Sequence, residues 1–169
     1  LIAGGHTFGK AHGAATPTPV PTEAANKRPT LSSLTVSTRK ISYDTDDYCP
    51  NAETRVTFRV KAGDDDGVTS VALFWREPGA GSYARSAMTR SAGSSASGTW
   101  QVTLDTTANG ITKAGSLAYY AVATDADGAT RRIPNGGSDS ITVAVCANTG
   151  PSIKNASSSS GSTLAWDPE

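Results

Sequence analysis

Thr54-Arg-Val-Thr-Phe-Arg-Val60 alternates polar and apolar side chains from Arg55 onward. The valines and the phenylalanine fall on one face of an extended chain, and the arginines and the second threonine fall on the other. This period of two is typical of a strand with one buried and one solvated face. The stretch therefore predicts an antiparallel sheet that covers a core on one side only.

The same pattern recurs on both sides of this stretch, separated by turn residues such as Gly63-Asp-Asp-Asp-Gly67. We expect further strands over 31–36, 68–76, 82–90, 99–104, 117–124 and 139–146. About seven short strands without a 3.6-residue period predict an all-β fold of two packed antiparallel sheets. A single barrel-shaped sheet is the main alternative.

The apolar positions of these strands define the expected core. Trp75 and Trp100 are in phase with apolar neighbours and are expected inside. In the run 117–124 we place Tyr120 and Val122 in the core, so that Tyr119 faces outward together with Tyr83. The expected core residues are Val56, Phe58, Val71, Leu73, Trp75, Trp100, Val102, Leu104, Tyr120, Val122, Ile141 and Val143.

Charge and hydropathy narrow the classes of partner. The 169 residues include 15 basic and 15 acidic side chains, so the formal net charge is zero. Such a chain has no electrostatic footprint for nucleic acid or an anionic membrane. No apolar run approaches the roughly 20 residues that span a bilayer, so we expect no membrane insertion within this sequence.

The composition divides the chain into four parts. Residues 15–29 carry alternating prolines that favour an extended linker, and residues 148–169 form a Ser-rich tail with little to bury. The β-sandwich is expected over 30–147, and residues 1–14 stand apart. We expect the whole to be part of a longer secreted or surface protein.

Cys49 and Cys146 bracket the predicted domain and leave two interpretations open. They are either two buried free thiols or a disulfide. A disulfide here would close a loop of on the order of a hundred residues, for which the chain-entropy estimate is about 4.7 kcal/mol. A small sandwich benefits from such a closure, which points to an oxidising compartment.

Several segments carry a family likeness: 66–76, 98–100, 120–128, Tyr43-Asp44 and Tyr48-Cys49-Pro50, together with a cysteine after the last strand. Over residues 30–147 the chain resembles the immunoglobulin-like and fibronectin type III-like modules of bacterial, particularly actinobacterial, extracytoplasmic proteins. The resemblance implies a sandwich fold. It leaves function open, because such modules serve as spacers, adhesive domains and binding domains.

The first fourteen residues read Leu-Ile-Ala-Gly-Gly-His-Thr-Phe-Gly-Lys-Ala-His-Gly-Ala. This stretch resembles the proximal haem-ligand segment of catalase-peroxidases. The resemblance implies a haem ligand at His6 and departs from the family at Ala11. Peroxidase chemistry also needs a proximal carboxylate, a distal His and Arg, and an enclosing pocket, and the rest of the sequence predicts none of these. A metal site of His6 and His12 would fall short of the three or four ligands that zinc takes.

Two acidic turns are the next candidate site. Asp64, Asp65 and Asp66 follow one predicted strand, and Asp125 and Asp127 follow another. If both turns lie at one pole of the sandwich, their oxygens suit Ca²⁺. The alternative is that these aspartates only build the turns through local hydrogen bonds.

No nucleophile elbow and no phosphate-binding loop is present, so we expect no enzyme. The sequence favours a non-catalytic extracytoplasmic module without an obligatory cofactor, acting as a spacer, in adhesion or in ligand recognition. Its partner would be an extracellular ligand or a neighbouring domain. One alternative is a carbohydrate-binding module that stacks sugars on Tyr83 and Tyr119. The other is a haem-binding peroxidase fragment acting through His6.

Overall fold

The computed structural model describes residues 25–43 and 52–146. Within them the chain forms strands and turns and contains no helix, so the prediction of an all-β fold is confirmed. The strands are β1 (Thr30–Val36), β2 (Lys40–Tyr43), β3 (Arg55–Gly63), β4 (Val68–Arg76), β5 (Ala84–Gly93), β6 (Ser97–Asp105), β7 (Gly115–Asp125), β8 (Thr130–Ile133) and β9 (Asp139–Val145).

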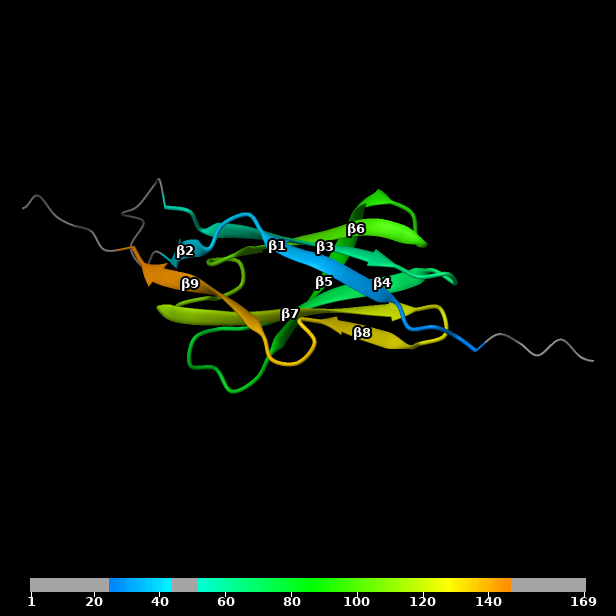
Figure 1. Cartoon of the computed structure of the whole chain (residues 1–169). Coiled ribbons are helices and arrows are strands. Elements are labelled where there is room, and N and C mark those ends of the chain that lie inside the picture. The colour runs from blue at the N-terminus through cyan, green and yellow to red at the C-terminus, as the bar shows by residue number, and fades with distance from the viewer. Residues whose placement is uncertain (1–24, 44–51, 147–169) are drawn as a thin grey trace, which may run out of the picture.

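These strands form one continuous, curled sheet in the order β1-β3-β6-β5-β4-β7-β9-β2, and β8 pairs with β7 off this path. All pairs are antiparallel except β2 with β9, which run parallel. The sheet is therefore mixed, and the purely antiparallel arrangement expected from the sequence is wrong at this one edge. In Figure 1 the body is elongated, and the segment before β1 and the end of β9 lie at opposite ends.

β2 and β8 were not predicted. Each has only four residues, too few to display an alternating pattern, and β8 contains two consecutive arginines. β8 and β9 pair with successive parts of the same strand, because Ala121 of β7 is opposite Ile133 and Tyr119 is opposite Asp139. Together they form one broken partner strand along β7.

The sheet curls because β5 changes partners along its length. Its first part, to Met88, pairs with β4, and its second part, from Thr89, pairs with β6. We call β1, β3, β6 and the end of β5 the β3 half. The β7 half comprises the start of β5 with β4, β7, β8, β9 and β2. β1 also approaches β8, which brings the edge of one half back to the other.

The core lies between the two halves. Phe58 of β3 and Tyr119 of β7 meet edge to face with ring centroids 4.8 Å apart. Trp75 and Trp100 are buried as predicted, and Trp75 donates from Nε1 to Ser86 Oγ at 3.0 Å. Seven further predicted core residues are also buried: Val56, Phe58, Val71, Leu73, Leu104, Ile141 and Val143. Val102 is only partly buried but packs against this core.

The predicted phase of β7 is wrong. Tyr119 is 2% exposed and belongs to the core, together with Leu117, Ala121 and Ala123. Tyr120 and Val122, which were expected inside, lie on the outer face and are only partly buried. The run is apolar on both faces, so alternation carries no information about which face is buried, and a shift of one residue exchanges the faces.

Burial of Tyr119 gives the stability a pH dependence. Burial raises the pKa of the Tyr119 hydroxyl above its ordinary value of 10.0, and the charge of Asp139 adds to this effect. The unfolded chain therefore loses this proton first, and stability falls as the pH rises above the ordinary value. In alkaline urea titrations we expect Tyr119→Phe to flatten this decline. A decline as steep in Tyr119→Phe as in the wild type would contradict the assignment.

Candidate functional site

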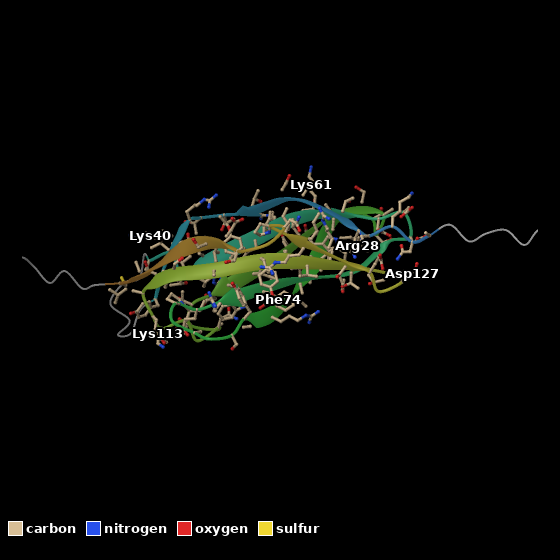
Figure 2. The ribbon with its side chains drawn as sticks, turned by 60° about the horizontal axis from the view of Figure 1, so that its bottom comes forward. Arg28, Lys40, Lys61, Phe74, Lys113 and Asp127 are labelled. Carbon is tan, nitrogen blue, oxygen red and sulfur yellow. The ribbon has the colours of Figure 1, made fainter. Side chains whose placement is uncertain are left out.

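The two acidic turns adjoin at one end of the molecule. One joins β3 to β4 and the other joins β7 to β8, and Val68 at the start of β4 is opposite Asp125 at the end of β7. Figure 2 shows Asp127 and Arg28 at this end, and Lys40 and Lys113 at the opposite end. We call the set Asp64, Asp65, Asp66, Asp125 and Asp127 the acidic pole.

The first aspartate of each turn has a structural role. Asp64 is 9% exposed and accepts a hydrogen bond from the Asp66 N–H at 3.0 Å. Asp125 is 2% exposed; its Oδ1 accepts from the Ala129 N–H at 2.7 Å, and its Oδ2 accepts from Asn26 Nδ2 at 3.2 Å. Turn building, the alternative weighed from the sequence, therefore accounts for part of the chemistry of these two side chains.

The other three carboxylates are exposed. Asp65 pairs with Lys27 Nζ at 3.1 Å, and this hydrogen bond lowers the pKa of Asp65. The pKa of Asp66 is raised, first by the charge of Asp65, then by burial, and then by the charges of Asp127, Asp64 and Asp125. The acidic pole is therefore a region of crowded negative charge that only Lys27 is seen to neutralise among the described residues.

A second candidate site lies on the outer face of the β7 half. Phe74 of β4 is directly opposite Tyr120 of β7, and their rings stack at 5.0 Å with an interplanar angle of 4°. Tyr83 meets Tyr120 edge to face, also at 5.0 Å. Arg132 lies 3.6 Å above the Tyr120 ring and Arg76 lies 4.9 Å above the Tyr83 ring. We call these five residues the outer aromatic cluster, and Figure 2 shows Phe74 midway between the two ends.

The Tyr120 ring is enclosed. β4 and β8 pair with opposite edges of β7, so Phe74 and Arg132 approach Tyr120 from opposite sides. Arg132 is fixed further by donating from Nη2 to the Gly137 carbonyl oxygen, while its Nε is buried without a hydrogen-bond partner. A sugar ring would therefore have to displace Phe74 or Arg132 in order to stack on Tyr120.

The chain matches no protein-family model, and a search of the curated proteins finds no significant match. The site must be interpreted from its own chemistry.

The outer face of the β7 half is also basic. On its strands, the charged side chains in phase with Phe74 are Arg76, Arg85, Arg132 and Lys40. No carboxylate shares that phase on the strands of this half, because Asp125 and Asp139 fall on the opposite phase. Charge is therefore unevenly distributed over the described residues, five of whose nine carboxylates lie at the acidic pole.

The two tyrosines predicted to stack ligands have different positions. Tyr83 is partly exposed within the outer aromatic cluster, whereas Tyr119 is in the core and is excluded as a surface residue. Four members of the outer aromatic cluster were not predicted as site residues from the sequence: Phe74, Arg76, Tyr120 and Arg132. The alternation in β4 could have indicated Phe74 and Arg76, because both are out of phase with the buried Trp75.

The remaining predicted site residues are only partly covered by the structure. His6, His12 and Cys49 lie outside the described residues, so the haem, two-histidine and disulfide hypotheses remain untested. Cys146 follows β9, and its N–H donates to the Tyr43 carbonyl oxygen at 2.9 Å. In the described ranges, no helix is long and apolar enough to cross a membrane.

Proposed function

We propose that the chain is a non-catalytic extracytoplasmic module with an immunoglobulin-like sandwich fold that recognises an acidic polysaccharide. The strand order supports the fold. β5-β4-β7-β9 corresponds to the order of one sheet of variable-type immunoglobulin domains, and β1-β3-β6 corresponds to the opposing sheet.

The Cys49–Cys146 disulfide belongs to the same proposal. The Tyr43 carbonyl oxygen accepts the Cys146 N–H, and Cys49 follows Tyr43 by six residues in the sequence, a span that chain connectivity allows to return to Cys146. No cysteine among the described residues is free. A disulfide at this position would tie the start of the domain to its last strand and suits an oxidising compartment.

The observation that carries the ligand class is the basic outer face built around aromatic rings. Guanidinium groups held over rings lose little freedom on binding and present planar donors to carboxylates. Tyr83 is partly exposed and offers apolar surface for the body of a sugar. Because the faces of Tyr120 are occupied, charge pairing at the rim is favoured over stacking of a neutral sugar.

Binding to sodium polygalacturonate, compared with neutral pullulan, tests the proposal by affinity electrophoresis. We expect retardation by the acidic polymer only. Arg76→Gln with Arg85→Gln should weaken binding at least ~10-fold, since charge-assisted hydrogen bonds contribute about 1.5–3 kcal/mol each. Arg85 is exposed and Arg76 is partly buried over the Tyr83 ring, so the melting temperature of the variant should fall only slightly.

A charge-matched control separates a site from general attraction. Arg59→Gln with Lys61→Gln removes two positive charges from the exposed face of β3, on the other half of the sheet. Polygalacturonate binding should survive this change. If both double variants weakened polygalacturonate binding equally, the binding would depend only on net charge and the proposed site would be wrong. If pullulan retarded the protein as much as polygalacturonate does, the protein would bind neutral sugars instead.

A further inference from the structure

We propose that the acidic pole is a Ca²⁺ site formed by Asp64, Asp65 and Asp66 with Asp127, and that Lys27 occupies it as a tethered cation in the absence of calcium. This site lies at the end of the molecule, apart from the outer aromatic cluster, and its occupancy does not depend on the proposed function.

The spacing of the carboxylates suits one ion. Asp64, Asp65 and Asp66 each offer an oxygen, and these atoms all lie within 4.8 Å of one another. Ca²⁺ binds oxygen at about 2.3–2.6 Å, so two oxygens on one ion are separated by at most about 5 Å. The turn therefore already holds its carboxylates at distances that a single calcium ion can bridge.

A buried, unpartnered oxygen in the same cluster points independently to a ligand. Asp64 is 9% exposed; its Oδ1 accepts the Asp66 N–H, while its Oδ2 is buried and has no hydrogen-bond partner. Leaving a carboxylate oxygen buried without a partner is unfavourable. A cation bound by the carboxylates of this turn would satisfy it.

The second turn brings a further carboxylate to the same place. Asp65, Asp66 and Asp127 line one depression together with Asn26 and Lys27, and Asp64 lines a neighbouring depression that shares Asp65 and Lys27 with the first. Asp127 is close enough for its charge to act on Asp66. The Asn26 side chain, whose Nδ2 donates to Asp125, also lines the depression, and an amide oxygen is a hard ligand of the kind that Ca²⁺ takes.

Lys27 is a weak competitor for this position. Its pair with Asp65 leaves the two side chains 79% and 53% exposed. Exposed ion pairs of this kind contribute little to stability. A divalent ion that engages several carboxylates at once gains more than one ammonium group does, so calcium should displace Lys27 from Asp65.

The ligand set also predicts selectivity. All the candidate ligands are oxygens, and no histidine or cysteine is among them, which disfavours zinc. Mg²⁺ demands near-octahedral geometry at 2.0–2.1 Å and dehydrates reluctantly, whereas an open cluster on two turns accommodates the irregular shell of Ca²⁺.

Isothermal titration of the whole, chelator-treated chain with CaCl₂ tests the site. We expect saturable binding of one ion with a dissociation constant of about 0.1–1 mM, the range of extracellular calcium modules. Calcium should raise the melting temperature, whereas NaCl at equal ionic strength should not. Asp66→Asn and Asp127→Asn should each weaken binding at least ~10-fold, because carboxylate count sets affinity.

Two further variants complete the test. Asp139→Asn removes one negative charge away from the acidic pole and should leave the calcium affinity unchanged. Asp139 is opposite Tyr119 in β7, which is six residues, or about 20 Å along the strand, from Asp125. Lys27→Gln removes the competitor and should tighten binding about threefold or more. No saturable heat, equal affinity for Mg²⁺, or equal loss in Asp139→Asn would overturn the calcium site. An unchanged affinity in Lys27→Gln would overturn the role of Lys27.

Discussion

Tyr119→Ala should destabilise the fold by about 3–5 kcal/mol, the range for removing a buried aromatic side chain. Tyr119 is 2% exposed and contacts Phe58 across the core, so its loss leaves a cavity between the two halves of the sheet. The neighbouring variant Tyr120→Ala removes a partly exposed ring and its contacts with Phe74 and Arg132. It should cost only about 1–2 kcal/mol.

Urea unfolding followed by the fluorescence of the buried tryptophans measures both variants under the same conditions. A lower midpoint with an unchanged slope reports lost stability without a change in the unfolded state. The comparison also tests the register of β7 against β4 and β9. If Tyr120→Ala proved the more damaging variant, β7 would be shifted by one residue and the outer aromatic cluster would be wrongly placed.

Reduction of the proposed Cys49–Cys146 disulfide should have the other large effect. Opening a loop of on the order of a hundred residues removes about 4.7 kcal/mol in the chain-entropy estimate. Urea unfolding with and without reductant should therefore show a large shift of the midpoint. The slope should also rise, because the reduced chain unfolds to a more expanded state.

Cys146→Ser is the matched variant for this measurement. It should reproduce the stability of the reduced chain and should not respond to reductant. Thiol titration of the oxidised protein under denaturing conditions should find no free thiol. Two titratable thiols, or a wild-type midpoint that reductant leaves unchanged, would contradict the disulfide and with it the argument for an oxidising compartment.

The longer strands were predictable because their polar and apolar residues alternate. β3 is the clearest example, since Val56, Phe58 and Val60 are buried as expected. β7 could be recognised as a strand, but its orientation could not. Leu117 to Thr124 offers apolar side chains to both faces, and only the packing of Tyr119 against Phe58 decides between them.

The candidate sites were predictable to different degrees. The acidic pole could be anticipated because both turns show Asp-x-Asp-Gly in the sequence, at 64–67 and 125–128. The outer aromatic cluster could not, because Phe74 and Tyr120 are 46 positions apart (120 − 74) and meet only through the pairing of β4 with β7. Sequence periodicity indicates which face a residue occupies and leaves open which strand lies beside it.

The placement of the two ends also has a mechanical consequence. The described chain enters at one end of the elongated body through β1 and leaves at the other through β9 (Figure 1). Tension along the chain therefore acts parallel to these strands and loads their hydrogen bonds in shear. Such bonds must rupture together, whereas a hairpin pulled from one end unzips one bond at a time. β1 on β3, and β9 between β7 and β2, are arranged as two clamps that carry load in series.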